Sequence, residues 1–161
     1  MSRLIYLDNA ATTKTAPEVV DAMIPYFTEH YGNPSSVYSF ASGNKEVVSR
    51  QREIIAQALG AQANEIYFTA GGSESDNWAL KATAETYEKK GKHIITTKIE
   101  HHAILHTCEY LEKQRGFEIT YLDVDENGVV KLDELKKAIR PDTILISVMF
   151  ANNEIGTCLL Y

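Results

Sequence analysis

Short β-branched and aromatic segments alternate with helical segments over the second half of the chain, and this alternation sets the fold class. The predicted strands are 65–69, 93–97, 117–122 and 143–150, and the predicted helices between them are 73–90, 102–115 and 132–139. Strands that alternate with helices in this way predict an α/β fold with a mainly parallel sheet flanked by helices. Because segment 143–150 is mainly apolar, we expect it in the middle of the sheet, covered on both faces.

The first half of the chain is predicted to be helical after an irregular start. Residues 1–16 are expected to form an N-terminal arm, and Pro17 is expected to open a helix that reaches residue 29. A second helix is predicted over 41–59, where Gly60 provides the stop. We therefore expect an arm followed by an incomplete α/β domain over residues 17–161.

Composition argues against several classes of protein. The 161 residues include 22 acidic and 16 basic side chains, so the net charge of −6 disfavours a nucleic-acid binder or a binder of anionic membranes. Two cysteines, Cys108 and Cys158, are too few for a disulfide framework, and we expect a reducing, cytoplasmic location. The chain reaches Asp8 too soon for a signal peptide, and no apolar run approaches the length of a membrane span.

Residues 69–77 lie between a predicted strand and a predicted helix and contain Gly71, Gly72 and Ser73. Glycines let the backbone approach a ligand, and free N–H groups at a helix start favour an anion, to which the Ser73 hydroxyl can also donate. The segment is neither a Walker loop nor a complete dinucleotide fingerprint. Two interpretations stay open: a phosphate-binding turn, or a plain turn in which Ser73 is the N-cap and Asp76 completes a capping box.

Three histidines follow the predicted strand 93–97. At the carboxyl end of a strand, the imidazole of His101 can stack on a planar ring or move a proton. His102 and His106 stand four residues apart, with Glu109 further along the same helical face, which also suits a metal site. No His-Glu-x-x-His pattern supports that site, so we expect no bound metal and interpret His102 and His106 as solvated or capping residues.

The polar residues Asn152, Asn153 and Glu154 follow the last predicted strand. Asn153 can hydrogen-bond a ring oxygen or a substrate carboxylate, and an ordinary capping loop is the alternative. Ser73, His101 and Asn153 each follow a different strand, so a parallel sheet brings them to the same edge. A phosphate anchor, a stacking ring and an amide together suit a flat, phosphorylated aromatic cofactor such as pyridoxal 5′-phosphate (PLP).

Residues Asp123–Glu134 fit the calcium-loop pattern Asp-x-Asp-x-Asn-Gly-x5-Glu. Three features oppose calcium binding: Lys131 occupies the ninth position, the entering segment 117–122 is predicted to be a strand, and no second loop is present. We interpret the segment as a strand-to-helix turn with Gly128 at its bend, and keep a calcium-binding loop as a minor alternative.

The sequence resembles the amino-terminal part of a cysteine desulfurase, in the class V aminotransferase group of fold-type I PLP enzymes. The matching stretches, in order and with the right spacing, are 5–13, 32–36, 68–77, 100–105 and 152–156. The resemblance implies part of a PLP-binding large domain and the cleavage of L-cysteine to L-alanine, with the sulfur left as a persulfide on an enzyme cysteine. Residues 152–156 resemble the branch that supplies sulfur for iron–sulfur cluster assembly and tRNA thiolation.

The resemblance also implies roles for individual residues. Gly72 and Ser73 would hold the PLP phosphate. His101 would stack on the pyridine ring and assist proton transfer, and Asn153 would bond near the phenolic oxygen and the substrate. The substrate entrance would be lined by Ala11, Thr12 and Asn33. A homodimer is implied, with a scaffold or sulfur-acceptor protein as a further partner.

Several parts of the family pattern have no counterpart in these 161 residues. The aspartate that pairs with the pyridine nitrogen, the Ser-Gly-His-Lys motif with the Schiff-base lysine, the persulfide cysteine, the substrate-binding arginine and the small C-terminal domain would all come later. Neither Cys108 nor Cys158 matches the persulfide position. The apolar ending 158–161 departs from the polar continuation that is usual in the family, and it suggests a frameshift, a premature stop or an expression boundary.

We therefore expect the chain alone to be inactive, with weak PLP binding or none. Because strand 65–69 would lack a neighbour, we also expect an unstable, oligomeric or aggregation-prone chain. A non-catalytic remnant that binds a full-length relative or another partner is the alternative function. The selenocysteine lyase branch stays open too, since the distinguishing residues would lie beyond position 161.

Overall fold

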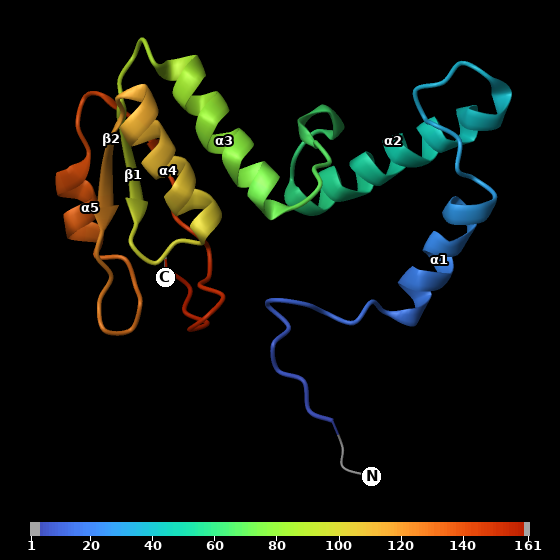
Figure 1. Cartoon of the computed structure of the whole chain (residues 1–161), viewed down its shortest axis with the longest axis horizontal. Coiled ribbons are helices and arrows are strands. Elements are labelled where there is room, and N and C mark those ends of the chain that lie inside the picture. Colours follow the sequence, from blue (N-terminus) through green and yellow to red (C-terminus); the bar gives the residue numbers. More distant parts are fainter. Residues whose placement is uncertain (1–3, 160–161) are drawn as a thin grey trace. The chain divides into compact units, whose positions relative to one another are not determined.

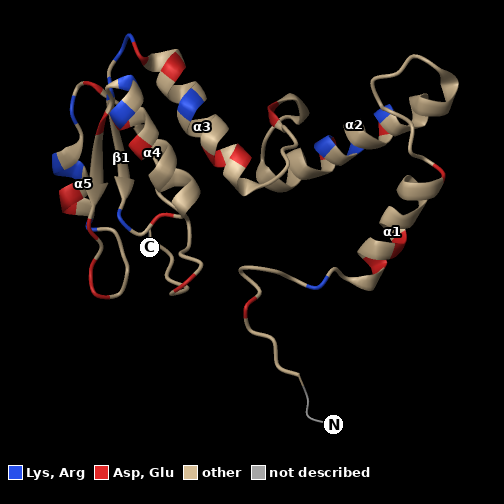
Figure 2. Cartoon of the chain, in the orientation of Figure 1, with Lys and Arg blue, Asp and Glu red and all other residues tan. Residues whose placement is uncertain are grey.

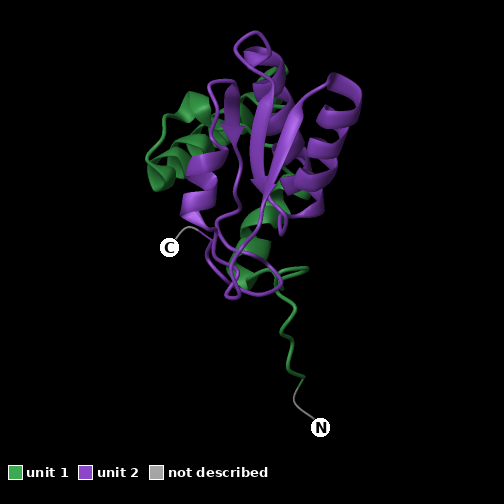
Figure 3. Cartoon of the chain, turned by 90° about the vertical axis from the view of Figure 1, so that its left-hand side faces the viewer, with its two compact units in different colours: residues 1–68 green, residues 69–161 purple. Residues whose placement is uncertain are grey.

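The computed structural model describes residues 4–159 and divides the chain into two compact units, residues 1–68 and 69–161 (Figure 1; Figure 3). The first unit contains helix α1 (Pro17–Thr28), helix α2 (Ser39–Leu59) and the 3-10 turn η1 (Ala63–Glu65). The second unit contains the strands β1 (His93–Thr97), β2 (Glu118–Leu122) and β3 (Thr143–Ile146) and the helices α3 (Gly72–Tyr87), α4 (His102–Arg115) and α5 (Leu132–Ala138). A parallel sheet flanked by helices confirms the predicted α/β class.

The two helices of the first unit begin and end within two residues of the predicted positions. Pro17 is the first residue of α1, where its missing N–H costs no intrahelical bond. Gly60 closes α2 in the left-handed conformation, with φ of 68°, and its N–H bonds to the carbonyl groups of Ala56 and Gln57. Residues 4–16 contain neither helix nor strand.

The predicted strand 65–69 is wrong. Residues 63–65 form η1, which is closed by a bond from the Gln62 N–H to the Glu65 carboxylate at 2.7 Å. Ile66 has an extended backbone, but residues 66–69 pair with no strand in the part of the chain that the structure describes. The β-branched and aromatic pattern records a conformational preference, and a strand also needs a neighbour for its N–H and C=O groups.

The sheet has the order β2-β1-β3, and β1 pairs in parallel with both neighbours. Every residue of β1 is buried, because the strand has a neighbour on each side and a covered surface on each face. Ile94 packs with α3 and α4 in one cluster, which includes Leu80 and Leu111. Ile95 points to the opposite face and packs with Leu122 and other residues on the α5 side. The alternation of a strand thus gives β1 two separate cores.

The prediction that segment 143–150 lies in the middle of the sheet is also wrong. Strand β3 ends at Ile146, and within residues 4–159 it is an edge strand with β1 as its neighbour. Its residues are only partly buried, and the side chain of Ile146 is exposed. The central strand is β1, although its sequence has two threonines and a histidine. The burial of a strand thus depends on its neighbours as well as on the apolar character of its side chains.

Acidic and basic residues are interspersed along α2, α3 and α5 (Figure 2). Such mixing gives no helix in this group a continuous basic face of the kind that binds nucleic acid. No helix within residues 4–159 is both long enough and apolar enough to cross a membrane.

Candidate functional site

Two depressions lie side by side at the carboxyl end of β1, and His101 and His102 line both of them. The first has a volume of ≈ 370 Å³ and is lined by residues that follow β1 and by residues that follow β3, among them Asn153. The second has a volume of ≈ 410 Å³ and is lined by Ser73 and other residues of α3 and by residues of α4. The fold therefore places His101 beside Ser73 in one depression and beside Asn153 in the other.

The start of α3 leaves the Ser73 hydroxyl outside the helix cap. Gly71 is the N-cap, and its carbonyl accepts the first intrahelical bonds from the N–H groups of Glu74 at 3.1 Å and Ser75 at 3.2 Å. The interpretation of Ser73 as an N-cap with a capping box is therefore wrong. The N–H groups of Gly72 and Ser73 precede these first bonds, and they face the end of the helix, where an anion is favoured.

His101 is the N-cap of α4. Its Nδ1 atom accepts a bond from the Ala103 N–H at 3.1 Å, so the proton of the neutral ring is on Nε2. The ring is exposed at the wall shared by the two depressions. One edge of the imidazole is thus fixed to the helix, and the other is available to a ligand.

The two following histidines are not arranged as metal ligands. The rings of His102 and His106 are stacked, with centroids 5.4 Å apart, and His106 lies 3.7 Å from the Glu109 carboxylate. Both side chains are exposed, as expected for solvated residues, and the capping role belongs to His101. Among the described residues, no group of three or more His, Cys, Asp or Glu side chains could hold a metal ion.

Asn152 and Asn153 have different environments. The Asn152 side chain is buried, and its amide donates to the Ile99 carbonyl at 2.9 Å. The Asn152 side-chain oxygen accepts bonds from the N–H groups of Glu154 at 2.8 Å and Ile155 at 3.1 Å. Asn153 is exposed and lines the first depression. Asn152 therefore shapes the loop, and Asn153 is the residue that can reach a ligand.

Glu100 is a buried site residue to which sequence reasoning assigned no role. One oxygen of its carboxylate accepts bonds from the Met149 N–H at 2.6 Å and from the Thr97 hydroxyl at 3.2 Å. Burial raises the pKa of Glu100 above its usual range, and these two bonds oppose that shift. The signal that could have found this residue is its place, an acid directly after a strand and directly before His101.

The three predicted entrance residues belong to the first unit, and their role at the substrate entrance stays a prediction. The Thr12 hydroxyl bonds to the Tyr6 hydroxyl. Asn33 accepts a bond from the Ser35 N–H at 2.9 Å in the loop before α2. Ala11 lies in the turn that follows Asp8, whose carbonyl accepts a bond from the Ala11 N–H at 3.2 Å.

The calcium-like segment is a tight hairpin turn. Val124 and Val130 form an antiparallel bridge, and Gly128 takes a φ of 81° in the bend. The carboxylate of Asp125 accepts bonds from the N–H groups of Asn127 at 2.8 Å and Val129 at 2.9 Å. The interpretation as a turn is confirmed, because the Asp125 carboxylate accepts hydrogen bonds from the backbone of the turn itself.

Comparison with known proteins agrees with the sequence resemblance. Residues 5–160 match the family described as aminotransferase class-V. Cysteine desulfurase IscS of Clostridium botulinum (strain Kyoto / Type A2) is 60% identical over 157 residues, which are 98% of this chain and 39% of that protein. Cysteine desulfurase IscS of Methanosarcina thermophila is 60% identical over 156 residues, 97% of this chain and 38% of that protein.

Solved structures show the same fold. A NifS-like protein superposes with a TM-score of 0.93 at 46% identity, over 96% of this chain and 42% of that chain. SspA in complex with cysteine gives a TM-score of 0.90 at 40% identity, over 96% of this chain and 44% of that chain. The chain thus spans about two fifths of the length of the relatives it matches. On the family match and these similarities, the chain belongs to the class-V aminotransferase family.

Proposed function

We propose that this chain supplies the phosphate-binding and ring-binding side of the PLP site of a cysteine desulfurase. The observation that carries the proposal is the position of His101, which lies between the depression lined by Ser73 and the depression lined by Asn153. The substrate would be L-cysteine, and SspA, a relative of similar fold, has been solved in complex with cysteine. The sulfur would serve iron–sulfur cluster assembly or thiolation in the cytoplasm, through a scaffold or sulfur-acceptor protein.

The residues present fit the phosphate and the ring of PLP. The N–H groups of Gly72 and Ser73 and the Ser73 hydroxyl are donors for a phosphate at a helix N-terminus. The exposed ring of His101 offers a flat surface for stacking, and the Asn153 amide offers a donor for a ring oxygen. When bound, PLP acts as an electron sink for bond cleavage at an amino acid.

The chain's own residues would bind and orient. Ser73 would stabilise the phosphate anion by donating hydrogen bonds from its N–H group and its hydroxyl. His101 would hold a proton on Nε2 while the Ala103 N–H fixes Nδ1, so the ring keeps one orientation. Asn153 would orient the substrate side of the ring from its loop.

We also propose that the 161 residues alone do not turn over L-cysteine, since they contain no Ser-Gly-His-Lys sequence. The measurement is alanine and sulfide released from L-cysteine by the purified chain with added PLP. No product above the level of free PLP is expected. Release of alanine and sulfide by the chain above the level of free PLP would overturn the proposal that it is inactive alone.

Binding is tested with pyridoxine 5′-phosphate, which has the phosphate and the ring but no aldehyde to react with surface lysines. We expect binding that is weakened about tenfold by Ser73→Ala and by His101→Ala, because each variant removes one ligand contact worth about 1.5 kcal/mol. His30→Ala, an exposed histidine of the first unit, serves as the matched control. No binding by the wild type, or equal binding by all variants, would overturn the proposed site.

A second function, association with a full-length relative through the family's dimer surface, is supported by the apolar surface of α1. Large apolar side chains of this helix are exposed: Val19, Val20, Met23, Ile24 and Phe27. A contiguous exposed apolar surface is typical of an interaction site or of an aggregation-prone chain. Co-purification with a full-length cysteine desulfurase subunit would support the proposal, and a chain that purifies alone from the same cells would contradict it.

A further inference from the structure

The sheet pairing between β1 and β3 ends before the chain reaches the site. The last register pair joins Ile95 to Ile146, and one further bond runs from the Ser147 N–H to the Ile95 carbonyl at 2.9 Å. His101 lies six residues beyond Ile95, and Asn153 lies seven residues beyond Ile146. Backbone pairing in the sheet therefore does not fix the separation of the two site residues.

Two side-chain bonds join the segments beyond the end of the sheet. Glu100, on the segment after β1, accepts the Met149 N–H from the segment after β3 at 2.6 Å. Asn152, on the segment after β3, donates to the Ile99 carbonyl on the segment after β1 at 2.9 Å. Each segment thus bonds through one buried side chain to the backbone of the other. We call these the two reciprocal bonds.

We propose that Glu100 and Asn152 are positioning residues that set the separation of His101 and Asn153 across the first depression. The proposal rests on the proposed function, in which these two exposed residues contact the ring of the ligand. Each positioning residue directly precedes the residue it positions, and each is more than nine-tenths buried. Exposed residues contact the ligand, and their buried neighbours hold the backbone.

Each positioning residue is itself fixed at a second point. The Thr97 hydroxyl, at the last residue of β1, donates to the Glu100 carboxylate at 3.2 Å. The Asn152 side-chain oxygen accepts the N–H groups of Glu154 and Ile155, so the backbone is held on the far side of Asn153 as well. Satisfied buried polar networks of this kind specify one arrangement, which apolar contacts of the same volume would not do.

The test compares Glu100→Ala, which removes the acceptor, with Glu100→Gln, which keeps an oxygen acceptor and nearly the same shape. Leu111→Ala is the control, because Leu111 is buried in the α4 core and touches neither reciprocal bond. The readouts are amide hydrogen exchange at Met149 and the affinity for pyridoxine 5′-phosphate. Both are measured at a temperature at which each variant is folded.

We expect Glu100→Ala to speed hydrogen exchange of the Met149 amide. We also expect it to lower the affinity for pyridoxine 5′-phosphate about tenfold, because His101 and Asn153 would no longer be held at the right separation. Glu100→Gln is expected to restore most of both values, and Leu111→Ala to leave the affinity unchanged. Wild-type affinity in Glu100→Ala, or an equal loss in Leu111→Ala, would overturn the positioning role.

A ligand-free measurement separates this proposal from the proposed function. In nuclear magnetic resonance spectra, Glu100→Ala is expected to shift the amide signal of Asn153, and Asn152→Ala that of His101, because each bond crosses to the other segment. If the wild type binds no pyridoxine 5′-phosphate, the proposed function fails, and these shifts still test the positioning residues. Unmoved signals in both variants would overturn the positioning role alone.

Discussion

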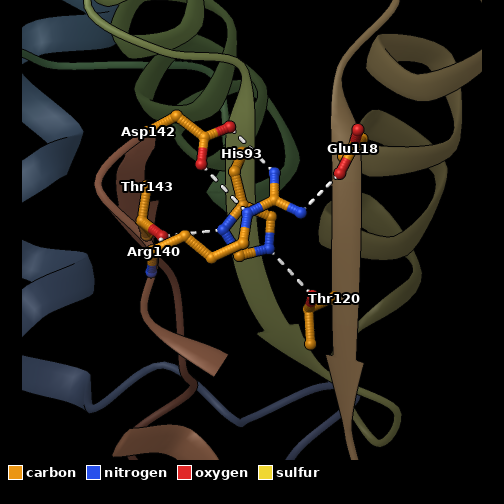
Figure 4. Close-up of polar contacts among 6 residues, drawn as sticks. All are labelled: His93, Glu118, Thr120, Arg140, Asp142 and Thr143. Atoms are coloured by element: carbon orange, nitrogen blue, oxygen red, sulfur yellow. Dashed lines mark hydrogen bonds and ion pairs between the residues drawn. The ribbon is translucent and has the colours of Figure 1, made fainter. Parts of the chain in front are cut away.

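The Nδ1 atom of His93, the first residue of β1, lies 2.7 Å from the hydroxyl oxygen of Thr143, the first residue of β3 (Figure 4). The other ring nitrogen, Nε2, lies 2.8 Å from the hydroxyl oxygen of Thr120 on β2. The Thr143 hydroxyl oxygen also accepts the Arg140 N–H at 2.8 Å, so its own hydrogen can be donated to Nδ1. The fully buried ring thus joins all three strands at the edge opposite the site, and its two bonds suit the neutral form.

Stability is expected to fall on mild acidification because of His93. Burial lowers the pKa of His93 from 6.5, the positive charge of Arg140 lowers it further, and Asp142 and Glu118 oppose the shift. Below the usual pKa the unfolded chain takes up a proton that the folded chain resists. The stabilising contribution is therefore present above pH 6.5 and is lost as the pH falls through the folded pKa. Urea unfolding between about pH 7.5 and about pH 5.5 measures it, and His93→Gln is expected to flatten the slope.

Glu100 acts in the opposite direction and provides an internal control. Because its pKa is raised from 4.5, its contribution to the free energy of unfolding is present below pH 4.5 and is lost as the pH rises through the folded pKa. Glu100→Gln is therefore expected to steepen the fall seen on acidification. A pH slope that is the same in wild type and His93→Gln would show that another group is responsible.

A side chain at position 91, which Gly91 occupies, is expected to destabilise the fold. A Cβ atom on Gly91 would lie 2.1 Å from the Asp142 carbonyl oxygen, which also accepts the His93 N–H at 3.2 Å. Relief of this contact would move the backbone that aligns β3 with β1, so Gly91→Ala is expected to destabilise by about 1–3 kcal/mol. Gly43→Ala in α2 is the control, since nothing lies within 4 Å, and it is expected to stabilise by about 0.5–1 kcal/mol. Thermal melts compare the two, and an unchanged melt for Gly91→Ala would contradict the expectation.

Elements with local signals could be predicted from the sequence. The predicted bounds of β1 and α4 agree with the structure residue for residue. The end of α4 has a local signal, because Gly116 closes the helix with a φ of 69°. The place of His101 and Asn153 beyond the ends of β1 and β3 followed from the rule that parallel strands share their carboxyl ends. Ser73 follows no strand within the described residues, and it reaches His101 from the start of α3. Such signals need no knowledge of distant residues.

Features that depend on distant partners could not be predicted in this way. Segment 65–69 has the composition of a strand, but within the described residues it has no neighbouring strand, as expected, and therefore forms none. Segment 143–150 has the same kind of composition, yet only its first four residues form a strand. Glu100 was visible as an acid beside a strand, but its partner is the N–H of Met149, 49 residues away in the sequence. The sequence pattern indicates which backbone conformation a segment prefers, and pairing with other segments decides where it lies in the sheet.

The two cysteines are expected to differ sharply in reactivity. Cys108 is fully buried, and burial raises the pKa of its thiol to about 12, with the charges of Glu100 and Glu112 adding to the shift. Because the thiolate is the reactive form, the folded chain should expose one fast thiol, that of the partly buried Cys158. Labelling with a chromogenic disulfide measures this, and Cys158→Ser should remove the fast phase. A fast phase that is lost in Cys108→Ser instead would contradict the assignment.

Calcium is expected to leave the chain unchanged. The Asp125 carboxylate is used by two backbone N–H groups, and the bond from Val129 is the main cause of its lowered pKa. Asp123 forms an ion pair with Lys98 at 2.7 Å, so a second potential ligand is also neutralised. Calorimetric titration with calcium is expected to show no heat, and Asp125→Ala to lower the melting temperature, because it frees two N–H groups, whereas Asp125→Asn keeps an acceptor. A melting temperature that rises with calcium in the wild type but not in Asp125→Ala would instead favour a metal-binding loop.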